Sequence, residues 1–187
     1  MFGFWRKQAA VPPTSDLGLS TWLADQTCAP GTHISYDPHL VDKLKHDHQE
    51  LEHLFLAIIH AGNQLQVQNI KPLMQRFHIL FNNHVLQEYI KLYVYLDTSL
   101  RDEPERQYTI RQCRREMRHI GKAVRGFLHK WEESPITIDE VPQFLKEAQR
   151  IGVVLGKRFK MEEAKLFEIY KLYPRMAQEH AALSLSN

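Results

Sequence analysis

The segment 77–96 constrains the fold most, because it carries two polar side chains in the middle of an apolar helical face. His84 and Glu88 are four residues apart, so their side chains stack one helical turn above the other. Burying an imidazole and a carboxylate together is costly unless they are paired or bind a metal. The pattern therefore indicates one half of a buried metal site. The apolar residues of this face are spaced three and four apart: Phe77, Leu80, Phe81, Leu92 and Tyr95.

Similar apolar spacing and capping residues predict four long helices in all. Asp37 is the expected cap of the first helix, and Asp139 that of the fourth. The loops between the helices are short, which favours an all-α, antiparallel, up-down four-helix bundle over 38–174. The helices are expected at about 38–63, 71–97, 105–133 and 140–173.

The remaining residues form an N-terminal arm at 1–37, with one short helix over 19–25, and a C-terminal tail at 175–187. The arm begins with aromatic and basic residues and is broken by prolines. It either lies across the bundle, with Trp22 covering the core, or acts as a docking peptide.

Composition narrows the class of protein. A chain of 187 residues can bury the core of one domain, and a net charge of +2 gives no reason to expect nucleic-acid binding. The two cysteines form no metal-binding or disulfide pattern, as is usual in a reducing compartment. No signal peptide and no membrane-spanning apolar run is evident, so we expect a cytoplasmic protein.

Polar residues interrupt the apolar stripe of every predicted helix near its middle, so they are expected to meet in one buried layer. Imidazole and carboxylate ligands together favour non-haem iron with open coordination positions. No nucleophile–base pair accompanies them, so we do not expect an enzyme. The inward polar residues are His48, His84, Glu88, Glu116, Arg158 and Glu162.

Three segments, taken in order, resemble the hemerythrin-like HHE cation-binding domain: DHQEL around His48, HVLQEYIKLYVYL from His84, and EEAKLFEIY from Glu162. The family pattern is a first-helix His, then two copies of His-x-x-x-Glu, each followed by a Leu–aromatic pair. The resemblance covers about residues 38–173 and implies an oxo-bridged diiron centre that handles or senses oxygen, nitric oxide or redox state.

The resemblance implies His48, His84, Glu88 and Glu162 as metal ligands, with one more His from the third helix. His119 is the nearest His by motif, whereas Glu116 is better placed by periodicity.

One position departs from the family pattern. Arg158 stands where the second His-x-x-x-Glu has its His, and a guanidinium stays protonated and cannot ligate a metal. We therefore expect one iron, or fewer than two, in a degenerate site. The segment IGVVLGKRFKMEEAKL also resembles the last helix of the regulator-of-sigma-D anti-sigma family, which implies a bundle that acts by protein contact without a metal.

Charge counting leaves both interpretations open. Three carboxylates and Arg158 give the buried layer a charge of −2 when both histidines are neutral, which cannot stay uncompensated. A divalent metal would neutralise it. Two protonated histidines, or one protonated Glu with one protonated His, would do the same in a metal-free network.

Six cations on one face of the third predicted helix form a candidate docking surface. We call this face the basic stripe: Arg111, Arg114, Arg115, Arg118, Lys122 and Arg125. Four of these, Arg111, Arg114, Arg118 and Arg125, are the expected contacts for an acidic protein partner. The other expected ligand is a diatomic gas at the metal.

Overall fold

The computed structural model describes residues 28–29 and 31–174, and in that part of the chain the fold is all-helical apart from one isolated bridge between Cys28 and Ser35. The predicted short helix at 19–25, Trp22 and the tail at 175–187 lie outside the described residues. The elements are α2 (Leu40–Asn63), α3 (Val67–Gln87), η1 (Glu88–Tyr93), α4 (Val94–Ser99), α5 (Pro104–Glu132), η2 (Ile138–Glu140), α6 (Val141–Met161) and η3 (Glu162–Leu166). Helical structure continues from η3 through 167–174.

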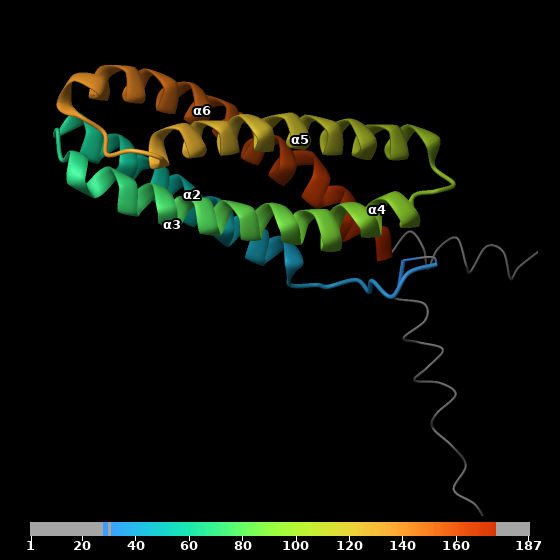
Figure 1. Ribbon diagram of the computed structural model, residues 1–187. Helices are drawn as coiled ribbons and strands as arrows, with labels where there is room; N and C mark the ends of the chain where they lie inside the picture. The colour runs from blue at the N-terminus through green and yellow to red at the C-terminus, as the bar shows by residue number, and fades with distance from the viewer. Residues whose placement is uncertain (1–27, 30, 175–187) are drawn as a thin grey trace, which may run out of the picture.

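These elements make four long rods, which confirms the predicted number of helices: α2; α3 with η1 and α4; α5; and α6 with its continuation (Figure 1). α2 packs on α3 and α6, and α5 packs on the same two helices from the other side. No helix in the described part of the chain is long and apolar enough to cross a membrane.

The helix ends differ from the predicted ones by a few residues, for local reasons. α2 begins at Leu40 rather than 38, although Asp37 does accept a hydrogen bond from the His39 N–H at 3.0 Å. α3 begins at Val67, which places Pro72 inside the helix instead of at its start. Before α6, Asp139 is not the cap. Thr137 and Glu140 form a capping box instead.

Two apolar clusters fill the bundle, and a polar layer separates them. The larger cluster includes Phe55, Phe77 and Phe144, and the smaller one includes Tyr95 and Tyr170. Along α2, α3 and α6, the residues of the larger cluster end where the polar residues begin, and those of the smaller cluster lie beyond them. The layer consists of His48, His84, Glu88, Arg158 and Glu162, each at most 2% exposed.

Two π-helical segments begin within this layer, η1 at Glu88 and η3 at Glu162. A π segment fits an extra residue into one turn, so the buried face shifts around the helix. Adjacent residues are buried in both segments, Leu92 with Tyr93 and Leu166 with Phe167.

Candidate metal centre

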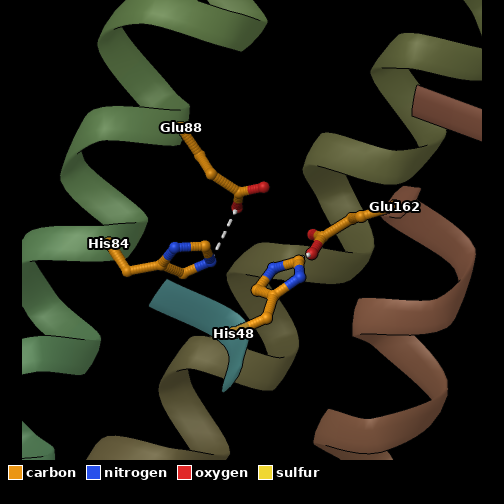
Figure 2. A group of neighbouring side chains, drawn as sticks. All are labelled: His48, His84, Glu88 and Glu162. Carbon is orange, nitrogen blue, oxygen red and sulfur yellow. Dashed lines mark ion pairs between the residues drawn. The ribbon is translucent and has the colours of Figure 1, made fainter. Parts of the chain in front are cut away.

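Four of the predicted ligands meet in one group, which we call the four-residue cluster: His48, His84, Glu88 and Glu162 (Figure 2). His48 comes from α2 and His84 from α3, while the two glutamates open the two π segments. One ligand atom from each residue lies within 4.8 Å of the others. Side chains from three rods therefore converge on a point that water does not reach.

The atoms that face one another in this cluster lack ordinary partners. Nε2 of His48, Nε2 of His84, both carboxylate oxygens of Glu88 and Oε2 of Glu162 are buried without a hydrogen bond. The His48 Nε2 lies 3.2 Å from Glu162 Oε2, and the His84 Nε2 lies 3.9 Å from Glu88 Oε2. Buried polar atoms without partners are destabilising. A metal ion at their centre would satisfy all four residues at once, so this donor set fits a metal.

Each imidazole also has a carboxylate at its other nitrogen. The Nδ1 of His48 lies 2.8 Å from Glu163 Oε1, and the Nδ1 of His84 lies 3.6 Å from Asp47 Oδ2. The Glu163 contact is a hydrogen bond, which holds a proton at Nδ1 of His48 and turns the Nε2 lone pair toward the centre, an arrangement common around metal-bound histidines. The Asp47 contact is too long for a hydrogen bond, and Nδ1 of His84 is buried without one among the described residues. The sequence analysis does not identify Asp47 or Glu163 as part of the site. The only indication in the sequence is that Asp47 directly precedes His48 and Glu163 directly follows Glu162.

Arg158 is buried beside the four-residue cluster, as predicted. Its Nε donates to Glu162 Oε1 and its Nη2 donates to the hydroxyl of Tyr93. Its Nη1 also forms a longer ion pair, at 3.7 Å, with Glu116 Oε2. The main carboxylate partner of the guanidinium is therefore Glu162, which lies four residues further along the same rod and one helical turn away.

Neither residue that we expected the third helix to contribute to the site, Glu116 or His119, lies in the buried layer. Glu116 is 64% exposed at its side chain, and His119 is exposed on the surface of α5. Met117 occupies the inward position on that turn, and neighbouring residues point about 100° away from it. The four-residue cluster therefore receives no ligand from α5 among the described residues.

Glu116 lies outside the buried set, but Asp47, at 7% exposed, lies inside it. Asp47, Glu88, Glu162 and Arg158 sum to −2 with neutral histidines. Burial and the nearby charge of Glu162 raise the pKa of Glu88 well above its ordinary value. Burial also opposes ionisation of Glu162, but contact with His48 and Arg158 outweighs burial and lowers the pKa of Glu162. A proton on Glu88 would therefore reduce the charge of this buried set, when it is metal-free, to −1 with neutral histidines.

Aromatic rings close the sides of the cluster. Phe159 stacks on the His48 ring, with 4.1 Å between centroids and 16° between planes. Phe167 lies parallel to the same ring at 5.6 Å. These rings fix the orientation of the imidazole and keep the surroundings dry, which strengthens electrostatic contacts inside the cluster.

The basic stripe lies on α5, and its members differ in their partners. Arg111 and Arg114 both approach the carboxylate of Asp97, at 3.3 and 3.9 Å. Arg118 and Arg125 are exposed and have no ion-pair partner among the described residues.

Comparison of the chain with models of protein families, with curated proteins and with solved structures finds no match.

Proposed function

We propose that this chain is a hemerythrin-like domain, an antiparallel up-down bundle that binds one non-haem iron ion through His48, His84, Glu88 and Glu162. The observation that carries the proposal is the convergence of four buried ligand atoms within 4.8 Å, most of them without a hydrogen bond. Two imidazoles and two carboxylates suit iron and leave coordination positions open for a further ligand.

A single ion follows from the residues around the cluster. Arg158 holds the outer oxygen of Glu162, where the family pattern would place a second imidazole. A second cation next to a guanidinium would be repelled, and α5 supplies no further ligand among the described residues. The degenerate site therefore binds one ion, and the side chains that hold this ion come from three rods.

We infer a role in sensing or handling oxygen, nitric oxide or redox state in the cytoplasm, without catalysis. Iron in such a site supplies reversible binding of a diatomic gas or a change of oxidation state. The chain's own residues orient the imidazole of His48 through Glu163 and keep water out with Phe159 and Phe167.

Metal analysis of protein purified from iron-supplied cells tests the proposal. We expect about one iron or less per chain and a higher melting temperature after iron is added under reducing conditions, because metal binds the folded state alone. Glu88→Gln should lose the metal. Glu50→Gln, an exposed change on α2, should keep it. A metal-free wild type whose melting temperature ignores added iron would refute the metal site.

A second candidate is a metal-free regulator that acts by protein contact, and one observation favours it. Nδ1 and Nε2 of His48 lie at 2.8 and 3.2 Å from carboxylate oxygens of Glu163 and Glu162, contacts that a metal-free network of His and Glu side chains would also use. In this case the basic stripe would meet an acidic protein partner, with binding that weakens as salt is added. Reversing Arg118 and Arg125 to Glu should abolish that binding without lowering stability.

A further inference from the structure

A small pocket lies between α3–η1 and α5, on the part of α5 that carries the basic stripe. Its volume is about 70 Å³, room for only a few heavy atoms. We call it the arginine pocket, because Arg114, Arg118 and Arg125 line it together with Tyr89 and Tyr93. The proposed iron site does not use these residues as ligands, so the pocket needs an explanation of its own.

The structure fixes two of the three guanidinium groups at the pocket walls. The Arg114 guanidinium lies 4.5 Å from the centre of the Tyr89 ring and donates to the Tyr89 hydroxyl. Both terminal nitrogens of Arg125 lie against Gly121, where an added Cβ would be 3.2 and 3.3 Å from them. Gly121 also lines the pocket, so the absence of a side chain there lets Arg125 fold back along α5.

The positive charge at this pocket is largely unpaired. Arg114 shares the carboxylate of Asp97 with Arg111, and in the described part of the chain Arg118 and Arg125 have no acidic partner. No carboxylate lines the pocket. Three guanidinium groups around a small space create a strong local positive potential, and guanidinium groups match the geometry of oxoanions with paired donors.

Tyr93 lines the pocket as a buried aromatic side chain. It is 2% exposed, and its hydroxyl accepts a hydrogen bond from Arg158 of the polar layer. The donors that the pocket offers are therefore its guanidinium groups.

We propose that the arginine pocket is a binding site for one small free oxoanion, such as inorganic phosphate. The donors are the guanidinium groups of Arg114, Arg118 and Arg125. The inference stands apart from the iron site, since it needs neither a metal nor the ligands of one. It also differs from an acidic protein partner, which would cover the whole basic stripe rather than the pocket alone.

Calorimetric titration with inorganic phosphate at constant ionic strength tests the site, and a matched pair of arginines on α5 separates the pocket from general surface charge. We expect one phosphate per chain in the wild type. Arg118→Gln and Arg125→Gln should each weaken binding by about tenfold to a hundredfold, the range for a charge-assisted hydrogen bond. Arg115→Gln makes the same charge change outside the pocket and should bind as the wild type does.

A matched pair of glycines tests the geometry without changing any charge. Gly121→Ala should displace the Arg125 guanidinium and weaken phosphate binding, whereas Gly126→Ala meets nothing within 4 Å and should leave binding unchanged. Both changes favour the helix, so neither should unfold the protein.

Three results would overturn the proposal. The first is no phosphate binding by the wild type, and the second is an equal loss in Arg115→Gln and Arg118→Gln, which would show a diffuse field. The third is binding of a phosphorylated peptide but not of free phosphate, which would assign these arginines to a protein partner. Metal content in Arg118→Gln should equal that of the wild type, so failure here leaves the iron site untouched.

Discussion

Two rods of the bundle carry the same local pattern, in which a glutamate follows four residues after a first polar residue and precedes a Leu–aromatic pair. The pattern differs between the rods at its first residue. On α3, His84 precedes Glu88 by four positions, and on α6, Arg158 precedes Glu162 by four. Each glutamate begins a π segment, and each π segment leads to a buried Leu–aromatic pair. We call these the histidine half and the arginine half of the layer.

The difference between the halves shows in their carboxylates. In the histidine half, both oxygens of Glu88 lack a hydrogen bond, and burial raises the pKa of this carboxyl. In the arginine half, Oε1 of Glu162 is held by Arg158, and the pKa of Glu162 is lowered despite its burial. The same backbone thus presents one carboxylate that is free for a ligand and one that a fixed cation already neutralises.

The largest expected effect comes from removing that cation. Arg158→Ala would leave Glu162 buried without its main counter-charge and the Tyr93 hydroxyl without its donor. We expect a loss of about 3–5 kcal/mol in the free energy of unfolding of the metal-free protein, measured with urea. Arg150→Ala, an exposed change on the same helix, should cost less than about 0.5 kcal/mol. Equal stability of the two variants would mean that Arg158 does not neutralise the layer.

A conversion of the arginine half into a second histidine half should change metal content. Arg158→His restores His-x-x-x-Glu and removes the charge that repels a second ion, so iron per chain should rise above the wild-type value toward two. Arg158→Lys keeps the cation and should leave the iron content unchanged. Elemental analysis of the three proteins makes the comparison, and identical iron in His and Lys variants would contradict it.

The two glutamates should respond oppositely to pH in the metal-free protein. Because the pKa of Glu88 is raised on folding, the folded state holds a proton that the unfolded state has released. Stability therefore falls as pH rises from the ordinary carboxyl range through the raised pKa, and Glu88→Gln should remove this fall.

Glu162 has the reverse sign. Its lowered pKa stabilises the fold above the ordinary carboxyl pKa, and that stability is lost on acidification, so Glu162→Gln should weaken the fold at neutral pH. Urea unfolding across a pH series distinguishes the pair. Parallel pH profiles of the two variants would show that the halves do not differ in charge.

The smallest effect is expected at a surface carboxylate far from both halves. Glu147 accepts hydrogen bonds from Lys130 at 2.6 Å and from Trp131 at 2.9 Å, and its pKa is lowered from 4.5 to about 2 chiefly by the Lys130 contact. Glu147→Gln should cost less than about 1 kcal/mol near neutral pH, since solvent screens this pair. The difference from wild type should shrink as pH falls below 4.5 toward 2. A cost as large as that of Arg158→Ala would remove the distinction between buried and exposed charge.

Much of the site could be predicted because its residues interrupt regular apolar stripes. His48, His84, Glu88, Arg158 and Glu162 each occupy an inward position of a helix with clear periodicity, and all are buried. Their convergence needs only that the helices pack side by side with their midpoints level. This is why four helices and most of one layer were accessible from the sequence.

The rest could not be predicted because it depends on the rotation of each helix to within one residue, about 100°. The apolar stripe of α5 tolerates an error of about 100°, which is enough to move Glu116 from the layer to the surface. The π segments leave the four-residue spacing of His84 and Glu88 unchanged, so the sequence pattern of this pair does not predict them. Asp47 and Glu163 act through side-chain reach across rods, which no pattern along one rod encodes.

The polar layer also bears on how the bundle comes apart. It separates two apolar clusters, so the packing free energy of each cluster is gained without much help from the other. Such a boundary favours partial opening, and the amide hydrogens of the smaller cluster should exchange with solvent before those of the larger one. An ion held by α2, α3 and α6 would tie both ends of the bundle to one point. Iron should therefore slow exchange on both sides of the layer and merge the two units into one cooperative transition.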